Sequence, residues 1–579
     1  MVAPTISEEE ERLSDGEPQP RGTLELTWTN KHLRLIESAG GAYDYAWVEP
    51  SDYRFAEVRL LHEAAASGES VQSDRTRGNL LIRGDALHVL RSLTALPEYA
   101  TEFVGKIKLA YLDPPFNTGK AFDHYQDTLE HSIWLTLMRD RLQQVERLLA
   151  PDGSVWVHCD DSEQAYLKVL MDEVFLRDRF VATVVWQKRT SRENRKAIGS
   201  GHDYIIVYAP AGAPGWARVR NLLPSDGRGY ANPDNDPRGP WRSIPMSAQA
   251  GHATAGQFYE ITTPTKAVVG PPRGRAWALT KPRFEEVLAQ DRVYFPRGGD
   301  GRPRLKRFPW EDEGLAPMTW WPAAEVGTND DAKKEILDLF PDIEQPFDTP
   351  KPERLMRRII EIATNEGDIV LDPFAGSGTT AAVAQKLGRR WVTSELQSDT
   401  IERYALPRLT KVVAGADPGG ITNDIDWTGG GGFAVLDVAP SMFSAEEGVV
   451  VLADWATGGT LAEVTAAQFG FIRESSGPFC GRKGQTRLAV VDGLVNRGVI
   501  AILLGYLAEN ENLFVCGTAI DQEARDDLAA ARPGSAVQPI PQAILTSYAR
   551  PRRWRPTLQT GPAQPVTTLA SERAAGVGS

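Results

Sequence analysis

Apolar and polar positions follow two different periods along this chain. Short apolar runs typical of buried strands occur at 79–83, 107–112, 154–158, 180–187, 203–208, 368–371 and 390–394. Elsewhere apolar residues recur every three or four positions, which predicts helices at 132–149, 330–340, 352–365 and 379–387. Strands that alternate with helices predict an α/β protein built on a mainly parallel sheet.

A span rich in proline and glycine interrupts this alternation and divides the predicted core in two. We therefore expect seven segments. They are a disordered tail at 1–22, an appended segment at 23–78, the first half of the core at 79–209, an insert of short strands and loops at 210–321, the second half of the core at 322–420, a smaller C-terminal α/β domain at 421–548, and a basic stretch with a disordered tail at 549–579.

Composition narrows the class of protein. A chain of 579 residues with 41% hydrophobic residues can bury a large core. Apolar runs such as Val499 to Leu507 are too short to span a membrane, and the acidic run Glu8 to Glu11 does not fit a secretory signal. We expect a cytoplasmic protein without a membrane partner. The three cysteines show no CxxC spacing and no histidine cluster, so neither a disulfide framework nor a metal site is indicated.

The net charge of −13 hides a local excess of positive charge. Residues 211–320 contain 16 lysines and arginines against 11 acidic residues, a balance of +5, and a basic run that begins at Lys188 and Arg189 precedes them. A solvated insertion with scattered charge would give the same count. The motifs on either side of this span favour phosphate binding instead.

A glycine-rich motif, Asp372 to Thr380 (DPFAGSGTT), joins a predicted strand to a predicted helix. Gly376 and Gly378 lack a Cβ, so a ligand can approach the backbone closely. Glu395, at the end of the next strand, can bind two ribose hydroxyls. The pattern predicts a nucleoside site, although taken alone it also fits a dinucleotide or a tight turn without a ligand.

A second motif, Asp113 to Phe116 (DPPF), follows the strand at 107–112. Two prolines stiffen the loop and leave its carbonyls free to accept hydrogen bonds, and Asp113 adds a carboxylate. Such acceptors suit an exocyclic amine, and Phe116 offers a flat surface on which an extruded base can stack. A lone tetrapeptide of this kind also occurs as an ordinary turn.

Together and in this order, the motifs resemble the β-class amino-methyltransferases of DNA. The chain looks most like the modification subunits of type III restriction-modification systems and related site-specific adenine methyltransferases. That family is circularly permuted, which implies a Rossmann-like sheet whose catalytic half precedes its cofactor half, with an inserted target-recognition domain. The matching segments are 79–85, 113–119, 153–161, 325–330, 347–352, 372–380 and 430–433.

The resemblance implies S-adenosylmethionine as the cofactor and a role for each matching residue. The catalytic residues would be Asp113, Pro114, Pro115 and Phe116. The cofactor residues would be Asp85, Ala86, Thr349, Lys351, Asp372, Phe374, Gly376, Gly378, Thr379 and Glu395. A helix cap stays open for Asp85, and a surface lysine for Lys351. The expected DNA contacts are Asn117, Lys188, Arg189, Arg273, Arg275, Arg302, Arg304 and Arg307.

The implied reaction methylates N6 of an adenine flipped out of double-stranded DNA, without a metal. In the family, aspartate at the position of Asp113 goes with adenine and serine with N4-cytosine. Tyrosine is more common where Phe116 stands, and phenylalanine keeps the stacking surface. Cytosine methylation stays open, as do an RNA substrate and a non-enzymatic DNA-binding module. A dinucleotide-dependent oxidoreductase would leave the DPPF motif and the basic insert unexplained.

The resemblance also suggests partners and a location. It suggests a homodimer and a restriction subunit supplied by another chain. It further suggests a bacterial cytoplasmic protein that lies at the nucleoid when bound to DNA.

Overall fold

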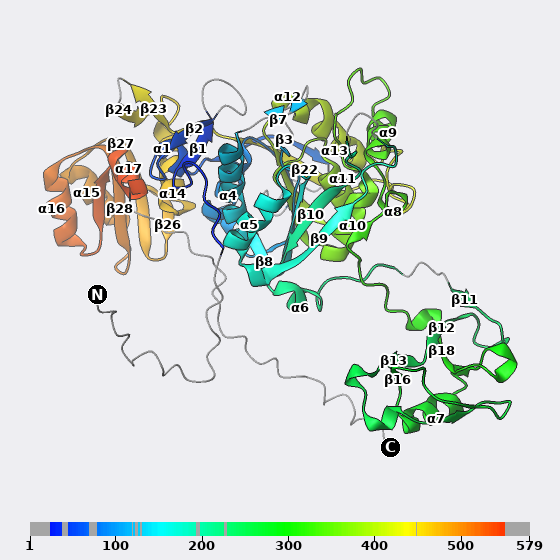
Figure 1. Cartoon of the computed structure of the whole chain (residues 1–579). Coiled ribbons are helices and arrows are strands. Elements are labelled where there is room, and N and C mark those ends of the chain that lie inside the picture. Colours follow the sequence, from blue (N-terminus) through cyan, green and yellow to red (C-terminus); the bar gives the residue numbers. More distant parts are fainter. Residues whose placement is uncertain are drawn as a thin grey trace, which may run out of the picture. The chain divides into compact units, whose positions relative to one another are not determined.

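The computed structural model of the chain consists of two compact units (Figure 1). One holds Met1–Arg220 and Thr319–Ser579, and the other holds Asn221–Met318. The tails expected at 1–22 and 549–579 lie outside the described residues, apart from Ala549 at the end of helix α17 (Gln542–Ala549). The structure describes residues 24–37, 45–68, 78–117, 120–121, 126–127, 130–192, 197–224, 229–446 and 449–549.

The first unit is organised around a ten-stranded sheet, with the order β19-β9-β10-β8-β5-β20-β21-β4-β22-β3 among the described residues. Neighbouring strands from β8 to β22 all run parallel, and β10 and β3 run antiparallel to the strands beside them. The bounds are β3 (Leu61–Gly68), β4 (Asn79–Arg83), β5 (Ile107–Leu112), β8 (Leu149–Cys159), β9 (Phe180–Trp186), β10 (Asp203–Tyr208), β19 (Trp320–Trp321), β20 (Ile369–Asp372), β21 (Arg390–Glu395) and β22 (Gly432–Val438).

The strand order confirms the permuted α/β sheet expected from the sequence. Strands β20 and β21, from the second half of the core, lie between β5 and β4 from the first half. Parallel strands end at the same edge of a sheet, where open α/β proteins bind their ligands. The loops that follow β5 and β20 are therefore neighbours, although they are far apart in the sequence.

Helices cover both faces of this sheet, as Figure 1 shows. One group consists of α2 (Ala86–Ala95), α4 (His131–Leu148) and α5 (Gln164–Phe175), and the other of α10 (Glu353–Ala363), α11 (Thr379–Lys386) and α13 (Leu406–Val413). In α10, apolar residues at helical spacing, such as Leu355, Ile359 and Ile362, are buried. The predicted helices are confirmed within a few residues. Smaller helices are α3 (Pro97–Phe103), α8 (Ala323–Val326), α9 (Asn329–Leu339) and α12 (Ser398–Thr400).

Two neighbouring strands of the main sheet, the edge strand β3 and β22 beside it, differ from the sequence prediction. The appended segment supplies not only a hairpin of β1 (Arg34–Glu37) and β2 (Tyr45–Val48) and the helix α1 (Tyr53–Ala56), but also β3. β22, which the sequence places in the C-terminal domain, pairs with β4 and β3. β3 is rich in alanine and shows no alternation, and β22 follows a run of glycines. No local pattern shows that these two segments pair with distant strands of the core.

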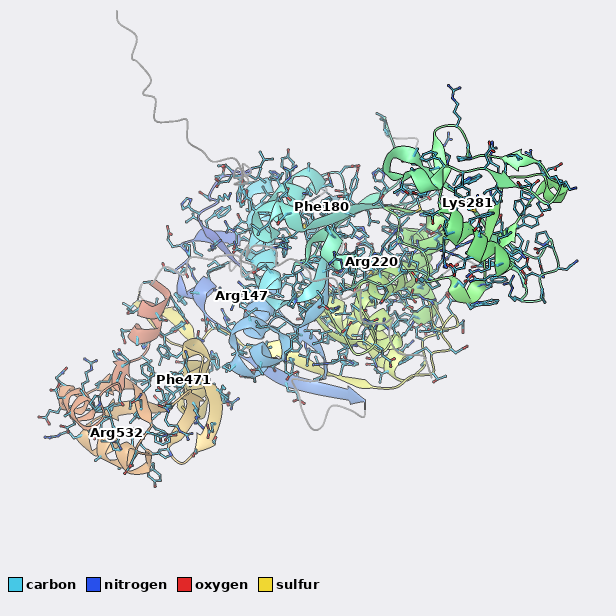
Figure 2. All side chains as sticks on the ribbon, turned by 90° about the horizontal axis from the view of Figure 1, so that it is seen from below. Arg147, Phe180, Arg220, Lys281, Phe471 and Arg532 are labelled. Atoms are coloured by element: carbon cyan, nitrogen blue, oxygen red, sulfur yellow. The ribbon has the colours of Figure 1, made fainter. Side chains whose placement is uncertain are left out.

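The C-terminal part carries a five-stranded sheet with the order β25-β26-β27-β28-β29. Phe471, labelled in Figure 2, stacks on Phe514 of this sheet with 5.9 Å between ring centroids. Gln468 donates to the Val58 carbonyl and accepts from the Val58 amide, and the buried core runs on into the main sheet. Residues 421–548 therefore form no separate unit. The bounds are β23 (Phe443–Glu446), β24 (Val449–Leu452), α14 (Gly458–Phe469), β25 (Ile472–Ser476), β26 (Phe479–Lys483), β27 (Thr486–Val495), α15 (Arg497–Tyr506), β28 (Asn512–Ile520), α16 (Gln522–Ala531) and β29 (Ala536–Pro539).

The second unit, Asn221–Met318, falls inside the expected insert but is shorter at both ends. Trp216 of α6 (Gly212–Trp216) and Trp321 of β19 both pack against Trp156 of β8, so these flanks belong to the first unit. The insert has its own core around Trp277, Phe284 and Val293. It contains β11 (Tyr230–Ala231), β12 (Trp241–Pro245), β13 (Ser247–Gln249), β14 (Ile261–Thr262), β15 (Val268–Val269), β16 (Arg275–Trp277), α7 (Lys281–Ala289), β17 (Val293–Tyr294) and β18 (Arg304–Arg307).

Candidate active site

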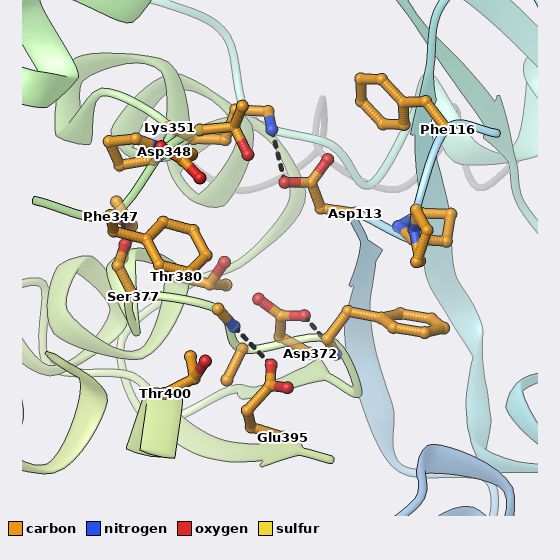
Figure 3. Close-up of a pocket in the computed structure, with 18 of the residues that line it drawn as sticks. Asp113, Phe116, Phe347, Asp348, Lys351, Asp372, Ser377, Thr380, Glu395 and Thr400 are labelled. Atoms are coloured by element: carbon orange, nitrogen blue, oxygen red, sulfur yellow. Dashed lines mark hydrogen bonds and ion pairs between the residues drawn. The ribbon is translucent and has the colours of Figure 1, made fainter. Parts of the chain in front are cut away.

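The two sequence motifs line one cavity of about 410 Å³ at the carboxyl ends of β5 and β20 (Figure 3). Pro114 of the first motif and Ser377 of the second both line it. Many of the residues predicted from the sequence to bind the substrate, the cofactor or DNA lie in the cavity wall. They are Asp85, Ala86, Asp113, Pro114, Pro115, Phe116, Lys188, Arg189, Thr349, Lys351, Asp372, Phe374, Gly376, Thr379 and Glu395.

Two of the expected residues in this region lie outside the cavity wall. Gly378 caps α11 with φ +78°, and a Cβ there would lie 3.3 Å from Ala405, so glycine serves the turn and its packing. Asn117, at φ 59°, donates to Glu163 at 2.8 Å. The side chain of Asn117 therefore stabilises the loop after Phe116.

The backbone at Gly376 is fixed by Glu395, as Figure 3 shows. The Gly376 amide donates to Glu395 Oε2 at 2.9 Å, and the Gln397 amide donates to Oε1 at 3.0 Å. Gly376 has φ +51°, and a Cβ there would lie 3.2 Å from the Phe347 ring. Burial raises the pKa of Glu395. A side chain at position 376 would thus narrow the cavity beside a fixed carboxylate.

Asp372 ends β20 and caps the loop that follows it. Its Oδ1 accepts a hydrogen bond from the Phe374 amide at 2.9 Å. Burial, together with the charges of Asp113 and Glu395, raises the pKa of Asp372 to about 7, although a hydrogen bond from Thr380 acts in the opposite direction. Asp85, Asp113, Asp372 and Glu395 all line the cavity. The wall as a whole carries eight acidic and five basic side chains, and this acidic excess suits a ligand that carries positive charge.

Asp113 and Lys351 lie side by side in the cavity wall and form an ion pair (Figure 3). Lys351 Nζ is 2.5 Å from Asp113 Oδ2 and 5.3 Å from the centre of the Phe116 ring. Asp113 Oδ1 is buried and has no hydrogen-bond partner among the described residues. The Pro115 carbonyl accepts a hydrogen bond from the indole of Trp134 at 2.6 Å, which holds the loop against α4. The loop thus presents one unpaired carboxylate oxygen. The pairing of Lys351 with Asp113 was not evident from the sequence.

A buried histidine supports Phe116. The His158 ring, at the end of β8, stacks on Phe116 with 5.5 Å between centroids and an interplanar angle of 25°. His158 Nδ1 lies 2.9 Å from the Tyr111 hydroxyl, and Nε2 lies 3.6 Å from Asp203, which also pairs with Lys188 at 2.6 Å. Burial lowers the pKa of His158, so the ring is neutral near pH 7. A polar residue inside the apolar run 154–158 was the only sequence signal for this support.

Asp85 is both a helix cap and a wall residue. Its Oδ1 accepts from the Leu87 amide at 2.8 Å at the start of α2, and its Oδ2 pairs with Arg141 at 2.5 Å. The alternative that Asp85 caps a helix is therefore correct for its Oδ1. Tyr45 of β2 and Leu137 and Arg141 of α4 also line the cavity. Sequence reasoning missed these three residues, because no motif surrounds them.

The five arginines of the insert that are expected to contact DNA differ in whether their side chains already make hydrogen bonds within the protein. The side chains of Arg273 and Arg307 are exposed and make no hydrogen bond or ion pair within the described part of the chain. Three others donate to backbone carbonyls: Arg275 to Ser247 at 2.8 Å, Arg302 to Gly270 at 3.1 Å and Arg304 to Ser243 at 2.9 Å. Lys188 and Arg189 instead line the cavity of the first unit.

Two further observations concern the described residues as a whole. They contain no group of three or more histidine, cysteine or acidic side chains placed to hold a metal ion. None of their helices combines the length and the apolar character needed to cross a membrane.

The fold and the cavity agree with one family of enzymes. The model of the DNA methylase family N6_N4_Mtase matches residues 107–405, more than half of the chain, and the protein belongs to this family. The StyLTI Mod subunit, a type III restriction-modification enzyme component of Salmonella typhimurium, is 30% identical over 395 residues, covering 60% of this chain and 58% of the relative. The type II methyltransferase M.EcaI of Enterobacter cloacae is 29% identical over 296 residues, covering 50% and 61%.

The chain thus spans less than two thirds of the length of these two relatives. Among solved structures, the cytosine-N4-specific PvuII DNA methyltransferase is similar with a TM-score of 0.32 and 14% identity, over 61% of this chain and 93% of that chain.

Proposed function

We propose that this protein transfers a methyl group from S-adenosylmethionine to N6 of an adenine in double-stranded DNA. One observation carries the proposal. Asp113, whose Oδ1 is buried and has no hydrogen-bond partner among the described residues, lines the same cavity as Gly376 and Glu395. An acceptor of hydrogen bonds for an amine and a glycine-lined nucleoside pocket thus share one space, as a direct transfer between two bound reactants requires.

The residues present fit S-adenosylmethionine. Gly376 leaves room that a Cβ would fill, Glu395 offers a carboxylate for ribose hydroxyls, and the acidic wall suits a sulfonium cation. When bound, the cofactor supplies a methyl group on positively charged sulfur. The residues that would hold it are Asp85, Ala86, Thr349, Asp372, Phe374, Gly376, Thr379 and Glu395, while Gly378 shapes the turn and Lys351 orients Asp113.

Asp113 and the loop after it would hold the adenine. Asp113 Oδ1 and the Pro114 carbonyl accept the two hydrogens of the exocyclic amine, which turns its lone pair out of the ring plane and toward the methyl group. Phe116 supplies the stacking surface for the extruded base. Flipping the base costs about a few kcal/mol, which contacts to DNA offset. Most of the rate acceleration would come from holding both reactants in place.

Adenine is the proposed base because the first residue of the motif is an aspartate. In the family that the sequence resembles, serine at that position goes with N4-cytosine instead. Cytosine has a comparable exocyclic amine, so N4-cytosine methylation is the alternative that the experiment must separate.

The insert would recognise the target sequence. Arg273 and Arg307 are exposed, which suits contacts with phosphates or guanine edges. We further propose that the protein is the modification component of a restriction-modification system in the bacterial cytoplasm. It would then act with a restriction subunit from another chain, as a homodimer, and lie at the nucleoid when bound to DNA.

The test uses purified full-length protein, genomic DNA and S-adenosylmethionine labelled in its methyl group. Mass spectrometry of the digested DNA should show labelled N6-methyladenine, and Asp113→Ala should abolish the label while DNA and cofactor still bind. Labelled N4-methylcytosine would show that the methylated base is cytosine and not adenine. Binding of NAD in place of S-adenosylmethionine, measured by calorimetry, would refute it. Single-molecule sequencing of DNA from expressing cells gives the target sequence.

A further inference from the structure

One carboxyl group joins the two ends of the segment that follows the DPPF motif. Glu163 Oε1 accepts a hydrogen bond from Asn117 Nδ2 at 2.8 Å and lies 2.9 Å from His131 Nδ1. Between Asn117 and His131 the chain forms the hairpin of β6 (Lys120–Ala121) and β7 (Gln126–Asp127). Glu163 therefore fixes both the point where the chain leaves the motif and the point where it enters α4.

The position of the Glu163 side chain is not explained by its own helix. Glu163 is the N-cap residue of α5, yet its side chain makes no capping hydrogen bond. The side chain is only 3% exposed, and Oε2 is buried without a hydrogen-bond partner among the described residues. Burial of a carboxyl group is costly unless hydrogen bonds offset it. Within the described part of the chain, the contacts of Oε1 with Asn117 and His131 are what offsets this cost.

These contacts bear on Phe116, the proposed stacking surface for the extruded base. On one side of Phe116, the Pro115 carbonyl accepts from the Trp134 indole at 2.6 Å. On the other side, Glu163 holds Asn117. Asn117 has φ 59°, a left-handed conformation that is uncommon outside glycine, asparagine and aspartate. The backbone of Phe116 is thus held on both sides, by α4 and by the residue that begins α5.

Glu163 is one step removed from the cavity. Pro115 and Phe116 line the cavity, whereas Glu163 and Asn117 do not. A residue in such a place can set the position of the loop without touching either reactant. Its loss should then affect how the base is held and leave the cofactor pocket as it is.

We propose that Glu163 is a positioning residue for methyl transfer, which acts through Asn117 and sets the position of Phe116 against the extruded base. This role deepens the proposed function and rests on it. It gives the Asn117 amide a task within the loop, in place of the contact with DNA expected from the sequence.

An exchange of the two partners tests the hydrogen bond directly. Asn117→Asp replaces the donor by a second carboxyl group, and aspartate also tolerates a positive φ. The single-turnover rate of methyl transfer to duplex DNA should fall roughly 10-fold to 100-fold, because two acceptors face each other and the loop moves. Adding Glu163→Gln returns a donor to the pair from the opposite side, and should restore the rate to within about threefold of the unchanged protein.

Two companion measurements define the result. Glu163→Gln alone keeps an oxygen that can accept from Asn117, so its rate should stay within about threefold. Affinity for S-adenosylhomocysteine, measured by isothermal titration, should stay within about twofold in all three proteins, because neither position lines the cavity. A lost contact between Asn117 and DNA could not be restored by Glu163→Gln. A double variant no faster than Asn117→Asp would therefore overturn the proposal.

Asp172→Ala is the matched control for Glu163→Ala. Asp172 lies on the same helix, pairs with Lys168 at 2.8 Å and accepts from the Tyr208 hydroxyl at 2.6 Å. Glu163→Ala should lower the transfer rate roughly 10-fold to 100-fold, whereas Asp172→Ala should leave it within about twofold. Equal losses in the two variants would mean that general loosening of α5 is responsible, and would overturn the proposal.

Other outcomes separate this proposal from the one it rests on. An unchanged rate in Asn117→Asp or in Glu163→Ala would refute the positioning role and leave the methyltransferase proposal standing. No transfer of label from S-adenosylmethionine to DNA by the unchanged protein would refute both. Asn117→Asp and Glu163→Ala break the same contact from opposite sides, so the question is decided even where one of the two variants folds poorly.

Discussion

The pairing of Lys351 with Asp113 shows how one cation can prepare a carboxylate for its task. Lys351 engages Oδ2 and leaves Oδ1 without a partner among the described residues. A freely rotating carboxylate would present either oxygen in many directions, whereas this one is held at a single orientation. Preorganised acceptors of this kind reduce the reorganisation that a reaction requires.

Lys351→Met should therefore reduce the rate of methyl transfer by roughly 10-fold to 100-fold, a usual range for loss of a positioned charge. Affinity for S-adenosylmethionine should change by less than about threefold. Single-turnover kinetics and calorimetry measure the two quantities, and Lys351→Arg, which retains the charge, should recover part of the rate. A large loss of cofactor affinity at an unchanged transfer rate would return Lys351 to the cofactor role that the sequence suggested.

Asp372 makes stability depend on pH. Its folded-state pKa of about 7 lies well above the usual value of 3.8, so between these values the folded state holds a proton that the unfolded state has lost. Stability from this group is complete below pH 3.8 and is lost as pH rises through 7. The loss is about 4 kcal/mol, since one unit of pKa difference is worth roughly 1.4 kcal/mol.

Asp372→Asn should flatten the fall in stability between about pH 4 and pH 7, because its Oδ1 can still accept from the Phe374 amide and it does not titrate. Urea unfolding across this range measures the effect. Glu335, whose pKa burial and Glu353 raise to about 7, contributes a similar slope that the variant leaves in place. If the free energy of unfolding changed with pH in the same way in the variant and in the unchanged protein, Asp372 would not be the group that titrates.

At the scale of helices, a buried group of charges joins α10, α11 and α13 beneath the glycine-rich loop. Glu353 pairs with Lys386 at 2.7 Å and with Arg408 at 2.9 Å, and Arg408 donates to the Thr379 hydroxyl at 2.8 Å. Lys386 also pairs with Asp417 at 2.7 Å. The position of the loop that lines the cavity is thus tied to the packing of three helices.

Glu353→Gln should destabilise the protein by about 3–5 kcal/mol, because it leaves two buried cations with one remaining carboxylate. Glu361→Gln is the matched control on the same helix. Glu361 pairs with Arg357 at 2.7 Å, with both side chains 29% exposed, and its loss should cost roughly 1 kcal/mol or less. Denaturant unfolding compares the two, and equal costs would show that the buried charges do not hold the helices together.

Elements with a strong local pattern could be predicted, and those defined by distant partners could not. The strands at 79–83 and 107–112 and helix α10 have apolar patterns that their burial requires. β3 has a weak pattern at the edge of the sheet, and the apolar run of β22 does not reveal that its partners are the distant strands β4 and β3. The same holds within the cavity. Asp113 and Gly376 lie in motifs, whereas Tyr45, Arg141 and His158 are placed only by tertiary packing.

At the scale of the whole molecule, the insert has the properties of an independent unit. It has its own core, and its two ends meet, since the Leu223 amide donates to the Leu315 carbonyl at 2.9 Å and Leu315 donates back at 2.8 Å. A short linker can therefore join residue 223 to residue 315. The cavity needs nothing from the insert, because all of its lining residues belong to the first unit.

Replacement of residues 224–314 by a short glycine linker should leave the affinity for S-adenosylmethionine within about twofold and remove methylation of DNA, because the proposed target contacts are gone. Calorimetry and transfer of label measure the two effects. In the full chain, the double variant Arg273→Ala, Arg307→Ala should reduce the salt dependence of DNA binding by roughly two units of slope if both residues contact phosphates. Sequence-specific methylation by the shortened protein would contradict this division of labour, because recognition would then reside in the unit that carries the cavity.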